Sequence, residues 1–336
     1  MTTSILPWQN DTWRQLTARI AQGELAHALL LHGPEGVGKN QFARELAKRL
    51  LCETAKGTAG ACGQCRSCQL LQADSHEDLF LLTPEEERTT IGVDAVRALI
   101  EFMNLTPRRG KFKVALVFPA DRMTLNAANS LLKTLEEPAT AAVFILVTSR
   151  PAMLPATVRS RCQKLHMTLP DHQTAVTWLT QRMASPTEAE HALRRARGAP
   201  LSALAEANED WRRAEENVFQ QWCNVAKNPS LVFDTAQGWT KGDGSQALRW
   251  LSGWVSDMAR CRATNDTAGM VDARRAGALQ AMAKQVDLKP LFTYLSAVER
   301  AVRDCGGALN SQLLVENVLL EWAALFGRTA QGHSQG

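Results

Sequence analysis

The sequence has no apolar run that approaches the roughly 20 residues needed by a membrane-spanning helix. Its first residues, MTTSILPWQNDTW, show neither the basic start nor the apolar stretch of a secretion signal. The chain also has no internal repeat of fixed period and no low-complexity tract, which excludes repeat arrays and biased linkers. We therefore expect a cytoplasmic protein with no membrane partner.

Positive charge exceeds negative charge only slightly. The net charge is +4 and the sequence pI is near 8.7, which permits contact with DNA without requiring it. With 45% hydrophobic and 21% charged residues, the composition is that of an ordinary globular protein. A length of 336 residues exceeds one ordinary core and indicates two or three domains.

Four of the eight cysteines lie within one short segment with the spacing C-x9-C-x2-C-x2-C. Without a secretion signal, thiols or metal ligands are expected rather than disulfides. Four thiolates with glycines between them suit a closed, tetrahedral, structural zinc site, formed by Cys52, Cys62, Cys65 and Cys68. Free thiols, an iron–sulfur cluster and a nucleic-acid-binding zinc knuckle remain the alternatives. The other cysteines are scattered and are expected to be buried thiols.

A glycine-rich turn follows the expected strand His27–His32 and precedes the expected helix Gln41–Leu51. Strand, glycine turn and helix form the context in which backbone N–H groups and a lysine hold phosphate. The candidate residues of this loop are Gly33, Gly36, Gly38, Lys39 and Asn40. Asn40 stands where a nucleotide hydrolase has Ser or Thr to hold magnesium, and an amide is a poorer ligand for that ion. Weak nucleotide binding and a turn that binds nothing both remain open.

The stretch from Lys113 to Cys162 organises the chain. The apolar runs Val114–Phe118 and Val143–Val147 predict buried strands, and the spacing of leucines over 124–137 predicts a helix between them. This is a βαβ crossover within a parallel sheet. Further strands are expected over 79–82 and 163–167, with a helix over 94–104. The predicted fold is therefore α/β, a parallel sheet flanked by helices.

The segment AANSLLKTLEEP at residues 127–138, followed by Ser160-Arg161-Cys162, resembles the bacterial clamp-loader branch of the AAA+ proteins. The resemblance implies an AAA+ domain over residues 1–167 with a zinc insertion at 52–68. It also implies a small helical lid over 168–208 and an all-α collar over 209–327, which holds subunits in a ring. Residues 328–336 are expected to form a disordered tail.

The resemblance also implies that residues needed to hydrolyse ATP are missing from this chain. Phe118 and Pro119 stand where the resemblance places the acids for magnesium and water, so that only Asp121 remains. Pro200, Leu201 and Ser202 stand where ATP-using relatives carry a second-sensor arginine. The sequence therefore predicts a subunit without ATPase activity of its own.

Arg161 is the candidate catalytic residue. The resemblance implies that it acts in trans as an arginine finger on the nucleotide of a neighbouring subunit, from the end of the last sheet segment. An arginine paired with an acid at a domain boundary is the alternative. Thr148, at the end of its strand, resembles the first sensor or is simply a strand-end cap.

The resemblance implies a hetero-pentameric ring with clamp-loader ATPase subunits and a delta subunit, which loads the sliding clamp on primer-template DNA during replication. Two alternatives remain: the ATP-hydrolysing motor subunit of the same loader, and a zinc-dependent nucleic-acid-binding module, whose DNA affinity would fall steeply with salt.

Three polar segments are expected to have structural roles only. We expect a solvated turn at His76–Asp78, an exposed basic turn at 108–111 and a loop at 238–245.

Overall fold

The computed structural model describes residues 5–85, 89–241, 244–267, 269–305 and 310–331. The chain divides into two compact units. The first extends to Gln181 and includes Gly198–Ser202; the second comprises Arg182–Arg197 and the chain from Ala203 onward. Within the described ranges, no helix is long and apolar enough to cross a membrane.

A five-stranded parallel sheet forms the centre of the first unit. Its strands are β1 (Ala28–His32), β2 (Leu79–Leu82), β3 (Lys113–Val117), β4 (Ala142–Thr148) and β5 (Gln163–His166), in the order β2-β3-β4-β1-β5. Every residue of β3 and β4 is buried, as strands covered on both faces should be. The predicted parallel α/β fold is therefore confirmed.

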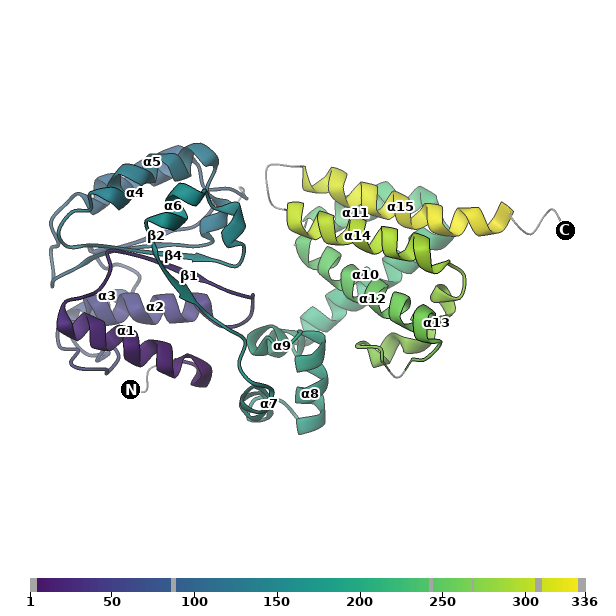
Figure 1. The fold of residues 1–336 in the computed structure, drawn as a ribbon, viewed down its shortest axis with the longest axis horizontal. Helices are drawn as coiled ribbons and strands as arrows, with labels where there is room; N and C mark the ends of the chain where they lie inside the picture. The colour runs from purple at the N-terminus through teal and green to yellow at the C-terminus, as the bar shows by residue number, and fades with distance from the viewer. Residues whose placement is uncertain (1–4, 86–88, 242–243, 268, 306–309, 332–336) are drawn as a thin grey trace. The chain divides into compact units, whose positions relative to one another are not determined.

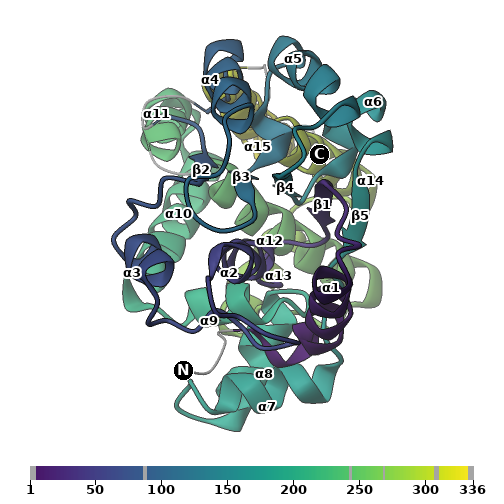
Figure 2. The same ribbon diagram turned by 90° about the vertical axis from the view of Figure 1, so that its left-hand side faces the viewer.

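Helices cover both faces of this sheet (Figures 1 and 2). They are α1 (Asn10–Gln22), α2 (Lys39–Leu51), α3 (Arg66–Gln72), α4 (Val93–Met103), α5 (Leu125–Glu136) and α6 (Ala156–Ser160). Helix α7 (His172–Thr180) belongs to the same unit, where the ring of Trp178 meets that of Trp8 edge to face. One core joins α1 and α2 to the sheet through residues such as Leu46, and the other joins α4, α5 and α6 through residues such as Leu131. The carboxyl ends of the parallel strands meet at one edge, where the loops that follow them lie.

Helix α5 illustrates how local sequence determines these elements. The side chain of Thr124 accepts a hydrogen bond from Ala127 N over 3.3 Å, which caps the helix start. Leu131 and Leu135 then lie on one buried face, at helical spacing. The helix ends at Glu136, two residues before Pro138, close to the predicted boundary.

The second unit is helical, as predicted for the C-terminal half. Its helices are α8 (Pro186–Arg195), α10 (Glu209–Lys227), α11 (Val232–Lys241), α12 (Gly244–Thr264), α13 (Ala276–Ala283), α14 (Leu288–Asp304) and α15 (Ser311–Gln331). Helix α9 (Pro200–Glu206) begins in the first unit and ends in the second. The rings of Trp222 and Trp322 stack with centroids 4.1 Å apart in its core. The tryptophan-rich composition therefore reflects a packed interior.

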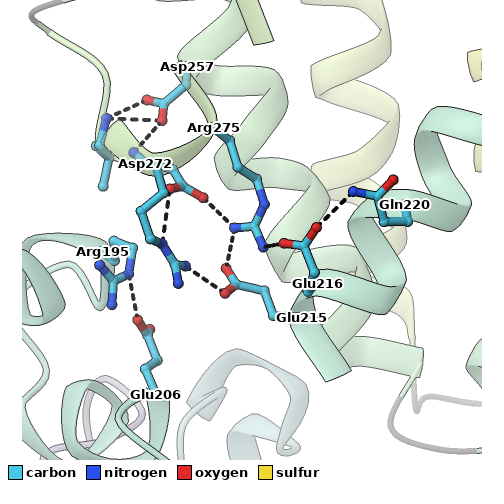
Figure 3. Close-up of polar contacts among 10 residues, drawn as sticks. Arg195, Glu206, Glu215, Glu216, Gln220, Asp257, Asp272 and Arg275 are labelled. Atoms are coloured by element: carbon cyan, nitrogen blue, oxygen red, sulfur yellow. Dashed lines mark hydrogen bonds and ion pairs between the residues drawn. The ribbon is translucent and has the colours of Figure 1, made fainter. Parts of the chain in front are cut away.

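Buried ion pairs tie the α12–α13 connection to helix α10 (Figure 3). Arg275, only 7% exposed, pairs with Asp272 at 2.6 Å, Glu216 at 2.8 Å and Glu215 at 3.2 Å. Asp257 accepts backbone N–H groups from residues 271 and 272 over 2.8–3.0 Å. Because each charge has partners, this network can be buried without leaving an uncompensated ion.

The expectation of a solvated turn at residues 76–78 is wrong. Asp78 is fully buried, and its carboxylate accepts the N–H groups of Arg108 and Arg109 and the ammonium of Lys113, over 2.7–3.1 Å. Burial opposes ionisation of Asp78, but these donors outweigh it and the pKa is lowered. His76 is also buried, and its Nδ1 accepts from Asp78 N. The cluster anchors the basic turn to the entry of β2.

Two boundaries in the helical half also differ from expectation. Gly238 lies inside α11 and Ser245 inside α12, so the predicted 238–245 loop is wrong; residues 242 and 243 lie outside the described ranges. Helix α15 continues to Gln331, so the predicted tail does not begin at residue 328, and 332–336 lie outside the described ranges. The two compact units do not have their boundaries at the predicted domain borders, after residues 167 and 208. The division into three domains therefore stays a prediction.

Candidate functional sites

The glycine-rich loop lies between β1 and α2, as predicted. Gly36 and Gly38 have φ angles of 73° and 86°, a left-handed backbone that glycine adopts without strain. A Cβ at Gly36 would lie 2.2 Å from Ser202 Oγ, and one at Gly38 would lie 2.4 Å from Leu6 Cδ1. The loop is therefore packed closely against other parts of its own unit.

Lys39 is turned inward. Its Nζ donates to the carbonyl oxygens of Gly33 over 2.8 Å and of Pro34 over 2.5 Å, and the residue is 6% exposed. Burial lowers the pKa of Lys39 to about 8. The positive charge that would meet a phosphate is thus engaged by the loop itself.

The N-terminal segment closes the loop from the other side, which the sequence did not reveal. Gln9 is fully buried, and its side-chain amide donates to the carbonyl oxygens of Val37 and Gly38 over 2.9 and 3.1 Å. Leu201 N donates to Gly36 O over 3.0 Å, in the segment where the sequence predicts that a second-sensor arginine is missing. These bonds tie the loop to the N-terminal segment and to Leu201.

Asn40 is the second residue of α2, next to Lys39. Its side-chain oxygen is buried and has no hydrogen-bond partner among the described residues. An orphaned acceptor of this kind is costly, and a bound cation would satisfy it, but an amide oxygen is a poorer magnesium ligand than a serine or threonine hydroxyl in this motif. The five predicted loop residues come together, with the Lys39 charge paired inside the loop and the Asn40 side-chain oxygen left without a partner among the described residues.

The acid in the turn that follows β3 is also already paired. Asp121 accepts from Thr148 Oγ1 over 2.6 Å and from Arg150 Nε over 3.0 Å, and its side chain is 4% exposed. Thr148 Oγ1 in turn accepts from Arg150 N over 2.9 Å, which is the strand-end cap role. Arg150 was missed from the sequence, since nothing but its place two residues beyond β4 marks it. Its guanidinium supplies the positive charge beside Asp121.

Arg161 lies at the C-terminal cap of the short helix α6, before β5, so the expectation that it ends a sheet segment is wrong. Val158 of α6 is fully buried and anchors this helix. The guanidinium forms an ion pair with Glu136 and donates to Thr157 O over 2.9 Å, while about a third of the side chain stays exposed. The arginine is thus held at the surface.

The four predicted cysteines converge. Their sulfur atoms all lie within 4.8 Å of one another, and the Sγ atoms of Cys52 and Cys65, like those of Cys62 and Cys68, are 3.9 Å apart. A tetrahedron of zinc–sulfur bonds of about 2.3 Å has edges of about 3.8 Å, so the spacing suits a tetrahedral ion. Backbone N–H groups of residues 62, 64, 65 and 68 donate to these sulfurs over 3.3–3.4 Å.

Hydrogen bonding prepares part of this cluster for ionisation. The hydroxyl of Thr54 and the N–H groups of Gln64 and Cys65 lower the pKa of Cys62 to about 5. Burial raises the pKa of Cys68, which holds its proton more firmly. Because metals bind thiolates, a cation would have to displace the proton from Cys68. The scattered Cys162 is buried as expected, and burial raises its pKa to about 11.

Comparison with known proteins gives concordant matches over both units. The model of the family "DNA polymerase III, delta subunit" matches residues 8–171, and that of "DNA polymerase III, delta subunit, C terminal" matches residues 194–324. DNA polymerase III subunit delta' of Pseudomonas aeruginosa is 35% identical over 96% of this chain and 98% of its own length. The Escherichia coli K12 protein of that name is 41% identical over 64% of each chain. Subunit tau of Escherichia coli K12 is 36% identical over 47% of this chain and 24% of its own length.

Proposed function

This chain belongs to the DNA polymerase III delta-prime subunit family, and on that premise we propose that it serves the clamp loader without hydrolysing ATP. In this proposal Arg161 reaches the nucleotide of a neighbouring ATPase subunit within a hetero-pentameric ring that also holds the delta subunit. The ring places the sliding clamp on primer-template DNA, and this chain meets the clamp and the DNA through the complex.

The observation that carries the proposal is a contrast between two sets of charged groups. Lys39 and Asp121, which would serve a nucleotide bound to this chain, are buried and paired within the chain. Arg161 is instead held at the surface, part exposed, with its guanidinium on the helix cap. The arrangement supports a subunit that contributes charge to a partner's nucleotide rather than using its own.

An arginine suits this role for chemical reasons. Its guanidinium is permanently charged and planar, and it can fork onto two phosphate oxygens. In GTPases an arginine finger raises kcat by a factor of about 10³–10⁵, because it stabilises the charge that develops in the transition state. A lysine would supply the charge without the fork.

We further propose that Cys52, Cys62, Cys65 and Cys68 hold one structural zinc ion. Four sulfurs leave no open position for substrate, so the ion would join the end of α2 to the start of α3 rather than do chemistry. Ser67 supports the site from outside, since its hydroxyl donates to Glu53 over 2.8 Å.

The test of the arginine proposal is DNA-stimulated ATP turnover by a reconstituted loader. We expect the isolated chain to be inert, and Arg161→Ala to lower turnover in the complex severalfold or more. Arg161→Lys should restore little, because the fork is lost. Lys164→Ala, which removes an exposed cation three residues away, is the matched control and should behave as wild type.

The outcomes separate the candidate functions. Turnover by the isolated chain would identify an ATP-hydrolysing motor subunit and overturn the proposal. A complex unaffected by Arg161→Ala would remove the finger from it. Tight, salt-sensitive DNA binding by the isolated chain would favour the zinc-dependent nucleic-acid-binding alternative.

A further inference from the structure

We propose that Glu136 is a positioning residue for Arg161, an inference that rests on the proposed function of Arg161 as a finger in trans. Glu136 is the last residue of α5, and Arg161 caps the end of α6. Twenty-five positions separate the two residues in sequence, yet they form an ion pair within the first unit.

One edge of the guanidinium, formed by Nε and Nη2, is bound to Glu136, and the opposite end points away from this acid. Nε donates to Glu136 Oε1 over 2.7 Å, and Nη2 donates to the same oxygen. Nη1 donates to Thr157 O over 2.9 Å, with Ser160 Oγ a distant 3.5 Å away. Arginine has five N–H donors. Among the described residues, the second Nη2 donor has no acceptor and the second Nη1 donor meets only the long contact to Ser160 Oγ, so these two can fork onto a phosphate while Glu136 stays bound.

The two helix ends that this ion pair joins are fixed in the core. Leu131 and Leu135 of α5 are buried, as is Val158 of α6. Thr157 O, within α6 itself, holds one end of the guanidinium, and Glu136 adds a second contact from another helix. Glu136 supplies the contact that selects one direction for the guanidinium, and pre-alignment of this kind is what raises a reaction rate at a fixed site.

Because the ion pair between Arg161 and Glu136 is partly exposed, its effect on the direction of Arg161 can be measured apart from any effect on folding. The Arg161 side chain is 32% exposed and that of Glu136 is 49% exposed. Exposed ion pairs contribute little to folding. Glu136→Ala should therefore fold as the wild type does, so that a change in turnover reports on the direction of Arg161.

The experiment measures DNA-stimulated ATP turnover by the reconstituted loader with variants of this chain. We expect Glu136→Ala to lower kcat by about threefold to tenfold, since misplacing a catalytic group by 1 Å can cost about a hundredfold. The KM for ATP should stay unchanged, because a finger acts on the transition state. Glu136→Gln should retain most activity, since both bonds go to Oε1 and an amide oxygen can still accept them.

Two further variants make the interpretation specific. Adding Glu136→Ala to Arg161→Ala should cause no loss beyond that of Arg161→Ala, because Glu136 works through the arginine. Glu137→Ala, which removes the exposed neighbouring acid, should behave as wild type.

Each contrary result has a distinct meaning. If Glu136→Ala leaves kcat unchanged or raises it, Glu136 does not position the finger; a rise would mark it as a competing counter-ion. A further loss in the Arg161→Ala background would show that Glu136 acts elsewhere, which also overturns the inference. Failure of Arg161→Ala itself to lower turnover would instead defeat the proposed function.

Discussion

The ammonium group of Lys39 donates a hydrogen bond to the carbonyl oxygen of Gly33, 2.8 Å away, within the glycine-rich loop. To bind a phosphate, the ammonium group would have to give up this bond. The same group bonds Pro34 O. A lysine in this arrangement stabilises the loop, and any nucleotide must compete with two existing bonds.

We therefore expect Lys39→Met to leave the turnover of the reconstituted loader unchanged. The free energy of unfolding should fall by about 1–2 kcal/mol, because two part-buried carbonyl oxygens lose their donor. Urea unfolding and turnover assays measure the two effects. Calorimetric titration of the wild-type chain with ATP should show no tight binding; tight binding that Lys39→Met abolishes would contradict this prediction.

For the cysteine cluster we expect one zinc ion per chain by elemental analysis. Cys65→Ser should lose the ion, because three thiolates do not complete the closed site, while Cys223→Ser, in the second unit, should keep it. Zinc should be released as the pH falls, since protons compete for the thiolates. A zinc content that is the same in both variants would place the ion elsewhere.

Asp78 should be among the most sensitive positions of the first unit. Asp78→Ala leaves Lys113, whose side chain is 3% exposed, without its partner, and should lower the free energy of unfolding by about 3–5 kcal/mol. The folded-state pKa of Asp78 is lowered, so its contribution is present above the unfolded value near 3.9 and is lost as the pH falls through the lower, folded value. Asp94→Ala, at an exposed acid paired with Arg97, should change stability by less than about 1 kcal/mol. Equal effects of the two substitutions in urea unfolding would refute the assignment.

Glu206 should give the second unit a pH dependence of the opposite sign. It is buried beside Arg195, 3.1 Å away, and burial raises its pKa from 4.5 to about 7 despite that arginine. Its raised pKa favours the folded state below pH 4.5, and this contribution is lost as the pH rises toward 7. The full shift corresponds to roughly 3 kcal/mol.

The difference in unfolding free energy between the wild type and Glu206→Gln should therefore fall between pH 4.5 and 8, as measured by urea unfolding at several pH values. Glu209→Gln, at an exposed acid on the next helix, is the matched control and should show no such slope. A difference that is flat or rises with pH would mean that Arg195 keeps Glu206 ionised throughout.

Several features followed from the sequence because they depend on neighbouring residues. The glycine turn and the four cysteines are local patterns, and the strand and helix periods identified the parallel sheet and α5 within a residue or two. That Asn40, Phe118 and Pro119 replace magnesium and water ligands stays a prediction, which for Phe118 and Pro119 rests on the family resemblance.

The failures share a different cause. Asp78 was expected in solvent because its sequence neighbours are polar. It is instead buried, and its carboxylate accepts hydrogen bonds from backbone N–H groups 30 and 31 positions away, which no pattern of side chains predicts. Gly238 was expected in a loop, yet the packing of α11 in the helical core outweighs the helix-breaking tendency of one glycine.

The sequence by itself therefore determined the family, the parallel sheet with its helices, the cluster of four cysteines and the place of the glycine-rich loop, because short-range spacing and residue chemistry encode them. Only the tertiary structure decided that Lys39 turns inward, that Arg150 pairs with Asp121, and that Glu136 holds Arg161. Those choices depend on which distant groups reach one another. Burial requires a partner for Lys39 and for Asp121, whereas the exposed Arg161 pairs with Glu136 because the fold brings the ends of two helices together.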